Sequence, residues 1–450
     1  MKQKLRELKA VRVVYCDLSG ITRCRLVPSG RYEHVAQHGL GLVASGIGMP
    51  AWGDVPPADS PHQVTGEWRL VPDPDTFITL PWYSYHGHVM ANLVAPPGTN
   101  WRCCPRQALQ NAVTALKERF GLELKIGFET EFVLLDPKKR LQGSEHLPAA
   151  ADDHTYCYAS AVDKFAAILD DMVGNLRRMQ LEVYQCHAEA APGQFEIATA
   201  PFSPLQAADK VLLTKAAISA VARQHDLMAT FLPKYFPDKA GNGLQFHFSL
   251  WQGENEVMSG SSRETLSASA SSFVAGILRH LPALVCFTAP STNSYRRIAP
   301  GCWSGAFRCW GNNNREAPLR VVFPPGPGEG GPHCEYKCSD GSSNPYVALA
   351  AVITAGMMGM EEKASLPPPV NVDPARMTEE ERRQAQADAL PTTLGDALHQ
   401  LDEDQSFRDG FESVVGSDLV KTFLACRHAD WNFFSAVDAS KEVELLYPKF

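Results

Sequence analysis

The chain has 450 residues, of which 44% are hydrophobic and 20% charged, so it can bury a large core and form two domains or one elaborate domain. A net charge of -8 and the lack of any dense Lys/Arg cluster argue against a nucleic-acid surface, and we expect small-molecule partners. Polar residues follow the first five, and the longest apolar stretch, 346–360, is too short to span a bilayer, so we expect neither a secretory signal nor a membrane segment. The 12 cysteines match no zinc or disulfide pattern, which favours a cytoplasmic protein with reduced thiols.

The first hundred residues are rich in β-formers and turns. Residues 12–17 and 22–27 predict two strands joined by a short hairpin connection. Pro105 then opens a helical pattern that runs to Phe120. This change predicts a domain boundary near residue 100, with one domain at 1–100 and a second at 101–450.

Beyond the boundary, helical patterns alternate with short strands. Helical periodicity covers residues 162–179, 204–227 and 267–281, and Ser203 is placed to cap the second of these helices. Residues 346–360 predict a buried helix and residues 378–388 an exposed one, whereas the glycine-rich run 326–331 predicts a loop. The fold class expected from this alternation is α+β.

Two strand patterns place acidic side chains on one face. In residues 126–135 the period of two puts Glu129 and Glu131 on the same side of a strand. Residues 183–197 predict a strand, a turn at Pro192-Gly193 and a returning strand, which adds Glu189 and Glu196. Four carboxylates are therefore available from these two segments.

Two further segments alternate in the same way. Residues 244–250 put Gln245, His247 and Ser249 on one face, and residues 334–338 pair Glu335 with Lys337. A single alternating strand most often shows its polar face to water. Across these four segments, however, five glutamates stand against one lysine, and converging carboxylates need cations to stay ionised. Oxygen ligands of this kind suit Mg²⁺ or Mn²⁺ better than zinc.

Six motifs, in order along the chain, resemble those of glutamine synthetases. They are Gly127-Phe-Glu-Thr-Glu-Phe, Glu189-(x)4-Gln-x-Glu-Ile, Gly241-Asn-Gly-Leu-Gln-x-His-x-Ser, Asn293-Ser-Tyr-Arg-Arg-Ile-Ala-Pro-Gly, Asn314-Arg-Glu-Ala-Pro-Leu-Arg and Asn344-Pro-Tyr-Val-Ala. The resemblance covers essentially the whole chain. It implies an N-terminal β-grasp domain and a catalytic domain whose antiparallel strands form a half-barrel site. It also implies a ring-shaped homo-oligomer with active sites at the subunit interfaces.

The resemblance further implies roles for individual residues. It assigns one metal to Glu131, Glu189 and Glu196, and the second metal to Glu129 and Glu335. It implies nucleotide binding by His247, Ser249 and Arg320, and phosphate and charge stabilisation by Arg315 and Arg320. Arg297 is expected to hold the α-carboxylate of glutamate, with Gly241 and Lys337 beside the substrate. The implied reaction is ATP-dependent amide formation through an acyl phosphate.

Four positions depart from the family pattern. Gln245 stands where a metal-binding histidine is usual, and an amide oxygen is a weaker ligand for most divalent ions. Lys337 stands where an arginine is usual, which keeps the charge and loses the bidentate geometry. At the amine end, Val43 replaces an aspartate of an early loop and Cys302-Trp303 replaces a glutamate of a closing flap.

An apolar lining at the amine end binds ammonium poorly and accepts an alkyl or aromatic amine. We therefore predict a ligase that joins the γ-carboxylate of glutamate, or a related acid, to an amine larger than ammonia, with Trp303 in the substrate site. The alternatives are an ordinary glutamine synthetase that uses ammonium, a catalytically impaired member with a structural or regulatory role, and a small-molecule binder without turnover.

Overall fold

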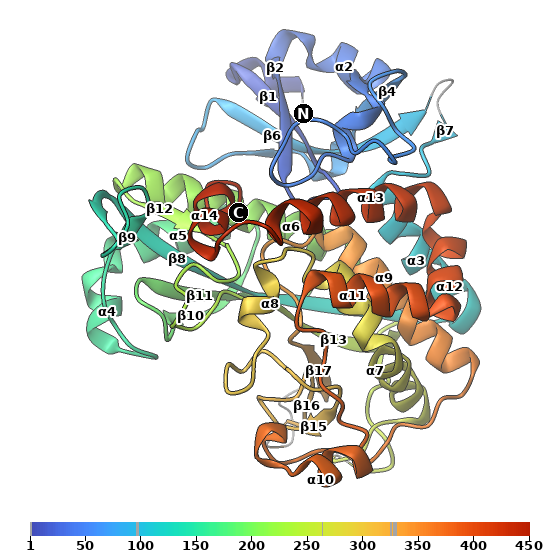
Figure 1. The fold of residues 1–450 in the computed structure, drawn as a ribbon. Helices are drawn as coiled ribbons and strands as arrows, with labels where there is room; N and C mark the ends of the chain where they lie inside the picture. Colours follow the sequence, from blue (N-terminus) through green and yellow to red (C-terminus); the bar gives the residue numbers. More distant parts are fainter. Residues whose placement is uncertain (1, 96–98, 263, 325, 327–330) are drawn as a thin grey trace.

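The computed structural model describes residues 2–95, 99–262, 264–324, 326 and 331–450, and it contains two β-sheets with helices packed around them. The predicted α+β class is confirmed. Most of the glycine-rich run predicted as a loop, residues 327–330, lies outside the described residues. Figure 1 shows the first sheet, in blue, above the larger helical body of the molecule.

The N-terminal sheet has the strand order β2-β1-β6-β4-β3, with β5 and β7 also paired to β6. Its central pair, β1 and β6, is parallel, and the other pairs are antiparallel. Helix α2 (Tyr32–His38) connects β2 to β3, and α1 covers Lys2–Glu7. The strands are β1 (Ala10–Cys16), β2 (Thr22–Pro28), β3 (Leu40–Val43), β4 (Glu67–Pro72), β5 (Ile78–Thr79), β6 (His86–Ala95) and β7 (Thr99–Asn100). The division into two domains at residue 100 stays a prediction.

The second sheet has the order β10-β11-β8-β13-β17-β16-β15 and curls into a half-barrel. Its strands were expected to be antiparallel, and the pairs along this path are, except that β15 runs parallel to β16. The long strand β8 also pairs with β9 and β12, and β13 with β14. The strands are β8 (Glu123–Arg140), β9 (Pro148–Ala150), β10 (Val183–Ala188), β11 (Gln194–Thr199), β12 (Met228–Thr230), β13 (Leu244–Gln252), β14 (Asn255–Glu256), β15 (Trp310–Asn312), β16 (Leu319–Val322) and β17 (His333–Tyr336).

The helices of this larger part begin with α3, which has the predicted bounds. They are α3 (Pro105–Phe120), α4 (Ala159–Lys164), α5 (Ala166–Arg178), α6 (Pro204–Gln224), α7 (Ala268–Thr288), α8 (Ser294–Arg297), α9 (Pro345–Glu361), α10 (Glu379–Gln384), α11 (Leu394–Glu403), α12 (Gln405–Val415), α13 (Ser417–Phe434) and α14 (Ala439–Leu446). Short 3-10 turns cover Ser29–Arg31, Ala44–Ile47, Pro74–Thr76 and Pro374–Arg376.

Two helix predictions need correction. The single helix expected at 162–179 is split into α4 and α5, because Phe165 leaves the helical conformation between them. Ser203 precedes α6 as expected, but its hydroxyl makes no cap bond and contacts the Gln206 side chain at 3.1 Å instead. In the exposed helix α10, by contrast, Thr378 and Glu381 form a capping box.

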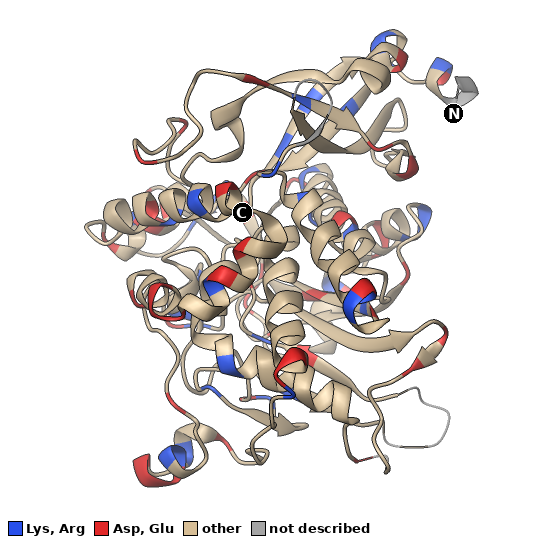
Figure 2. Ribbon diagram, turned by 90° about the vertical axis from the view of Figure 1, so that its right-hand side faces the viewer, with Lys and Arg blue, Asp and Glu red and all other residues tan. Residues whose placement is uncertain are grey.

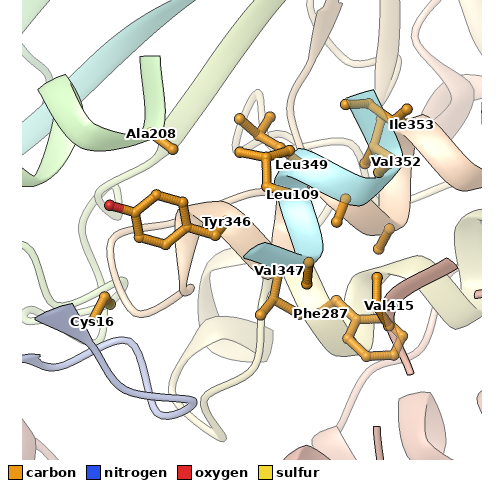
Figure 3. Packing of buried hydrophobic residues seen from close by; sticks show 14 of the residues in the cluster. Cys16, Leu109, Ala208, Phe287, Tyr346, Val347, Leu349, Val352, Ile353 and Val415 are labelled. Carbon is orange, nitrogen blue, oxygen red and sulfur yellow. The ribbon is translucent and has the colours of Figure 1, made fainter. Parts of the chain in front are cut away.

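Helix α9 lies at the centre of the core, where Tyr346 and Val347 pack near Leu109 and Phe287 of neighbouring helices (Figure 3). Its closest partner is α7, and a Cβ on Gly276 of α7 would lie only 2.2 Å from the backbone oxygen of Ala355. Helix α7 is long and apolar enough to cross a membrane by length and composition, which the sequence analysis did not anticipate. However, 78% of its apolar window is buried inside the structure, which makes it a core helix.

Helix α13 fastens the N-terminal part to the larger part. The buried Arg427 donates to Ser19 Oγ at 2.6 Å and pairs with Asp430 at 2.9 Å, and Asp430 accepts from the backbone of Ala51 at 2.9 Å. Figure 1 shows α13 directly beneath the blue sheet. Charged residues of both signs are interspersed along the outer helices, as on α10 (Figure 2).

Candidate active site

The curled sheet brings the polar faces of four strands together. Register places Glu196 opposite Glu131 and Gln245 opposite Glu129, so β11, β8 and β13 present their polar residues side by side. On the far side of β13, His247 lies opposite Glu335 of β17. The convergence on which the sequence argument depended is therefore present.

These side chains surround one cavity of about 740 Å³. Thirteen of the residues singled out from the sequence line it: Glu129, Glu131, Glu189, Glu196, Gly241, Gln245, Arg297, Cys302, Trp303, Arg315, Arg320, Glu335 and Lys337. His247 is not part of the cavity wall, but its Nε2 is 3.0 Å from Oε1 of Glu129, which is. Ser249 lies two residues further along β13, where its hydroxyl accepts from the Trp251 indole at 2.8 Å. Val43 is half-exposed at the end of β3 and does not line this cavity.

One group of possible metal ligands joins three strands. Ligand atoms of Glu129, His247 and Glu335 all lie within 4.8 Å of one another, and His247 Nε2 is 3.0 Å from Glu129 Oε1. Burial alone would raise the pKa of Glu335. The nearby Lys337, His247 and Arg320 outweigh burial and hold that pKa well below its usual range. This group therefore keeps a carboxylate charge ready for a cation.

A second group lies on the β10–β11 hairpin. Ligand atoms of His187, Glu189 and Glu196 also lie within 4.8 Å of one another, and His187 Nε2 is 2.9 Å from Glu189 Oε1. Burial and the charges of Glu129 and Glu131 raise the pKa of Glu196 to about 10. Burial and these neighbouring charges therefore favour the protonated form of Glu196 when no cation is bound.

Glu131 lies beside these groups, and hydrogen-bond donors from the backbone and from side chains contact both of its carboxylate oxygens. Its Oε2 accepts from the backbone of Gly243 at 2.9 Å and from Gln194 Nε2 at 3.1 Å, and its Oε1 accepts from Gln245 Nε2 at 3.3 Å. Burial raises the pKa of Glu131 to about 7, although the charge of Arg297 opposes the shift. The structure thus brings His187, rather than Glu131, into the second group.

Arg297, at the end of α8, is positioned for an anionic substrate. Its side chain is buried, Nη2 donates to the Lys337 carbonyl at 3.2 Å, and Nη1 has no hydrogen-bond partner among the described residues. Two glycines make room for it, since a Cβ on Gly241 would lie 2.9 Å from Arg297 Cγ and one on Gly243 would lie 2.6 Å from Nη2. A buried, unpaired guanidinium nitrogen facing a cavity suits a carboxylate.

The loop after α8 holds Trp303 at the mouth of the cavity. Its φ of 52° lies in the left-handed region, which is uncommon for a bulky residue, and its backbone N–H donates to Glu316 Oε1 at 3.2 Å. The Arg315 guanidinium lies 5.9 Å from the indole centre. Cys302 lines the same mouth.

Among the cavity residues that the sequence analysis did not single out, His187 and Tyr156 carry the most chemistry. His187 shares a strand face with Glu189, so the alternation that identified Glu189 could also have identified it. Tyr156 lies in an irregular loop, and its ring meets the Trp303 ring edge to face at 5.7 Å. No periodicity marks such a position.

The donor atoms of both groups fit hard divalent cations. Each group combines two carboxylates with one imidazole. Carboxylates held this close repel one another unless a cation neutralises them, and this repulsion adds to burial in raising the pKa of Glu196. Oxygen-rich ligation with one nitrogen suits Mg²⁺ or Mn²⁺.

Comparisons with known proteins agree with this geometry. A family model described as the glutamine synthetase catalytic domain matches residues 102–446. Gamma-glutamylpolyamine synthetase GlnA3 from Streptomyces coelicolor is 32% identical over 92% of this chain and 88% of its own length. A glutamine synthetase from Methanocaldococcus jannaschii is 33% identical over 81% and 79%.

Solved structures show the same fold. A glutamine synthase homologue has a TM-score of 0.84 and 28% identity, covering 98% of this chain and 99% of its own. GmaS in complex with ADP has a TM-score of 0.82 and 26% identity, covering 98% and 96%. The half-barrel and its acidic cavity thus define a glutamine synthetase-like ligase. The chain belongs to the glutamine synthetase family, whose members use ATP and divalent metal ions.

Proposed function

We propose that this protein joins the γ-carboxylate of glutamate to an amine larger than ammonia, using ATP and forming an acyl phosphate. The observation that carries the proposal is the composition of one cavity. It combines two carboxylate–imidazole groups, the buried and partly unpaired Arg297, and the aromatic side chain of Trp303 in the cavity wall. GlnA3, whose name states a γ-glutamyl product, and GmaS, solved with ADP, support the proposal.

The protein's own residues supply binding and charge stabilisation. Arg297 binds the α-carboxylate of glutamate, and Lys337 lies beside it within the buried network. Arg315 and Arg320 line the cavity, and we propose that they stabilise the charge that develops on the transferred phosphoryl group, a role suited to fixed guanidinium donors. His247 and Ser249 lie on β13 toward the expected nucleotide end.

The carboxylate groups would hold the metal ions: Glu129, His247 and Glu335 one ion, and His187, Glu189 and Glu196 the other, with Glu131 alongside. When bound, such ions neutralise these carboxylates and the phosphate oxygens of ATP. We also propose a cytoplasmic, ring-shaped homo-oligomer whose sites lie at subunit interfaces, as the family relationship suggests. Light scattering coupled to size exclusion tests that assembly.

The reaction proceeds in two balanced steps. A γ-carboxylate oxygen of glutamate attacks the terminal phosphorus of ATP, the bond to the bridging oxygen breaks, and ADP leaves. The amine nitrogen then attacks the acyl carbon and loses a proton, and the bond from that carbon to the phosphate oxygen breaks, releasing phosphate. Water must be kept from the acyl phosphate, a task that suits the aromatic mouth.

The test is phosphate release from ATP with Mg²⁺ or Mn²⁺ and glutamate, comparing ammonium with a panel of primary amines and following product mass. Turnover with alkyl or aromatic amines and little with ammonium is the expected result. Preference for ammonium would favour an ordinary glutamine synthetase. Failure of every amine and every related acid, in assembled protein that binds ATP, would favour the non-catalytic alternatives.

A further inference from the structure

A second cavity, of about 550 Å³, lies beside helix α8, and no residue of its wall lines the acidic cavity. The wall comes from α8, from the loop that follows β12, from the start of α11, and from α13 and α14. Ligand cavities in proteins commonly enclose about 300–1,000 Å³. The size of this cavity therefore suits a small organic molecule.

Much of this wall is apolar. Its aromatic and aliphatic side chains include Leu394, Trp431, Phe434, Val437, Ala439 and Val443. An aryl or branched alkyl group gains free energy when it leaves water for such a surface. The cavity thus suits a molecule with an apolar body.

The charged residues of the wall, within the part of the chain that the structure describes, are Lys234, Arg296 and Glu442. Glu442 is buried, and it accepts from Arg296 Nε at 2.7 Å and from Asn293 Nδ2 at 3.3 Å. Lys234 is also buried, and its ammonium donates to the Lys239 carbonyl. The wall therefore carries two cations against one carboxylate, and that carboxylate already has its donors.

Arg296 offers a free pair of donors. Its Nε is held by Glu442, whereas Nη1 and Nη2 make no hydrogen bond to any described residue, and the side chain is 43% exposed. A guanidinium that is anchored at one nitrogen and free at the other two presents a fixed fork to a carboxylate. A doubly charged phosphate in the same place would lie close to the Glu442 carboxylate, so a singly charged anion is favoured.

Three carboxylates lie near the wall but outside it. Asp238 contacts Lys239 at 3.5 Å, Asp438 caps the start of α14, and Asp396 lies in the first turn of α11. All three residues are exposed, so water and salt screen their charges. They do not cancel the excess of positive charge in the cavity itself.

Two segments are shared by the two cavities. Helix α8 contributes Arg296 to this cavity and Arg297 to the acidic one, and the loop after β12 contributes Lys234 to this cavity and Gly241 to the acidic one. The segments are bonded to each other, since Lys234 N donates to Asn293 Oδ1 at 2.7 Å and Asn293 Nδ2 donates to the Lys234 carbonyl at 3.1 Å. A molecule that holds Arg296 therefore also steadies the segments that position Arg297.

We propose that this cavity is an effector site for a small monocarboxylate with an aryl or branched alkyl body, that Arg296 binds the carboxylate, and that occupancy strengthens glutamate binding at Arg297. The site is separate from the cavity to which the ligase reaction is assigned. The link to glutamate rests on the proposed function, whereas binding of the monocarboxylate does not.

The first experiment measures binding by calorimetry to the assembled protein without ATP, with phenylacetate as the probe. The comparison compounds are 2-phenylethanol, which keeps the ring and replaces the carboxylate by a neutral hydroxyl, and acetate, which keeps the charge without the ring. We expect phenylacetate to bind at one site per chain and each of the other two to bind at least about 10-fold more weakly. Absence of phenylacetate binding in the millimolar range, or equal binding of inorganic phosphate, would overturn the proposal.

Two variants with matched controls locate the binding site. Ala439→Phe fills the cavity, and Ser440→Phe places the same ring one residue along α14, at an exposed position outside the wall. Arg296→Gln removes the charged fork but keeps a donor for Glu442, and Arg308→Gln removes an arginine that pairs with Asp388 outside this wall.

We expect phenylacetate affinity to fall at least about 10-fold in Ala439→Phe and Arg296→Gln and to stay unchanged in both controls. The unfolding temperature of each variant shows whether it is folded, and either test variant is sufficient alone. Unchanged affinity in a folded test variant would overturn the assignment of the site.

The second experiment measures glutamate affinity with and without saturating phenylacetate. We expect phenylacetate to tighten glutamate binding by about 5-fold or more, and glutamate to tighten phenylacetate binding by the same factor, because coupling between two sites is reciprocal. Ala439→Phe should abolish this effect and Ser440→Phe should keep it. Displacement of phenylacetate by glutamate would place the probe in the acidic cavity and overturn the proposal.

The remaining outcomes separate the effector site from the proposed function. Glutamate affinity that is unchanged by bound phenylacetate would overturn the effector role. If phenylacetate binds as expected but the wild-type protein binds no glutamate, the result counts against the proposed acid substrate and leaves the monocarboxylate site in place.

Discussion

Lys337 Nζ donates a hydrogen bond to Gln245 Oε1 at 2.5 Å. These are the two positions at which the catalytic strands depart from the family pattern. From the sequence, the loss of a metal-binding histidine and the loss of an arginine are two unrelated changes. In the structure they form one network, since Lys337 also contacts Glu335 at 2.7 Å and Gln245 Nε2 donates to Glu131. The amide oxygen that replaces an imidazole accepts from the ammonium that replaces a guanidinium, so each replacement suits the other.

The first prediction concerns this pair. Gln245→His removes the acceptor of Lys337 and Lys337→Arg forces a larger group into a buried position, so each single change lowers kcat/KM for glutamate by at least about 10-fold. The double variant restores the family pairing and recovers part of the loss. A double-mutant cycle on glutamate-dependent phosphate release is expected to give a coupling of about 1–3 kcal/mol. Additive effects of the two changes would contradict a linked pair.

The second prediction separates two roles for His247. The family resemblance assigns it to the nucleotide, whereas the structure places its Nε2 beside Glu129 in a possible metal group. We expect His247→Gln to weaken Mn²⁺ binding without nucleotide by at least about 10-fold, measured by electron paramagnetic resonance titration.

His333 provides the control for this measurement. Its ring lies 5.0 Å from the His247 ring, but it belongs to neither group, so His333→Gln leaves Mn²⁺ affinity unchanged. If His247→Gln instead raises KM for ATP at unchanged Mn²⁺ affinity, the nucleotide role is correct and the metal role is not.

The third prediction is a pH dependence of metal binding. Burial and neighbouring carboxylates raise the pKa of Glu196 from a usual value near 4.5 to about 10. Burial raises the pKa of Glu131 from the same value to about 7. The folded, metal-free protein therefore holds protons that the unfolded chain has lost, and its stability falls as pH rises from about 4.5 through these values. A cation that displaces a proton binds more tightly as pH rises, by up to about tenfold per unit.

Calorimetric titration of the metal-free protein with Mg²⁺ or Mn²⁺ at pH 6.5 to 8.5 measures this effect, and buffers of different ionisation enthalpy count the released protons. Mg²⁺ should raise the unfolding temperature more at pH 8 than at pH 6. Glu196→Gln removes the largest titrating group, so its metal affinity is weaker and changes less with pH. A wild-type affinity that is independent of pH would show that no proton is displaced.

Much of the site follows from alternation in the sequence. The period of two correctly grouped Glu129 with Glu131 and Glu335 with Lys337, since all four line the same cavity and alternate residues of an extended chain share a face. The same alternation predicts that His187 lies on the strand face that carries Glu189. Pairing of β8 with both β11 and β13 is a long-range property, so the convergence itself needed either the family motifs or the structure.

Other features had no local signal. Tyr156 reaches the mouth through the packing of an irregular loop, and the break at Phe165 lies within an apolar pattern that continues on both sides of it. The bond between Lys337 and Gln245 depends on the register of β13 and β17, which neither segment encodes alone. The metal, nucleotide and substrate roles of individual residues, the domain boundary and the ring assembly stay predictions.

The fourth prediction concerns Glu442, which contacts the residues around helix α8 and so supports the position of Arg297. Glu442 of α14 is almost fully buried and accepts from Arg296 Nε at 2.7 Å, from Asn293 Nδ2 at 3.3 Å and from the Thr292 hydroxyl. Arg296 is the neighbour of Arg297 on the short helix α8 and faces a separate cavity of about 550 Å³. Glu442 thus holds α8 from the side opposite the substrate.

Glu442→Gln keeps the shape of the side chain, removes its charge and leaves one acceptor oxygen where three donors converge. The loss of charge-assisted bonds is expected to lower the free energy of unfolding by about 1.5–3 kcal/mol, measured by urea denaturation. Because Arg297 grips the substrate carboxylate, looser anchoring of α8 raises KM for glutamate several-fold with a smaller change in kcat. Glu444→Gln, on the same helix, breaks only a surface pair with Lys441 and should change stability by less than about 0.5 kcal/mol and leave KM unchanged. A stability loss in Glu442→Gln without any change in KM would show that Glu442 supports the fold but does not position Arg297.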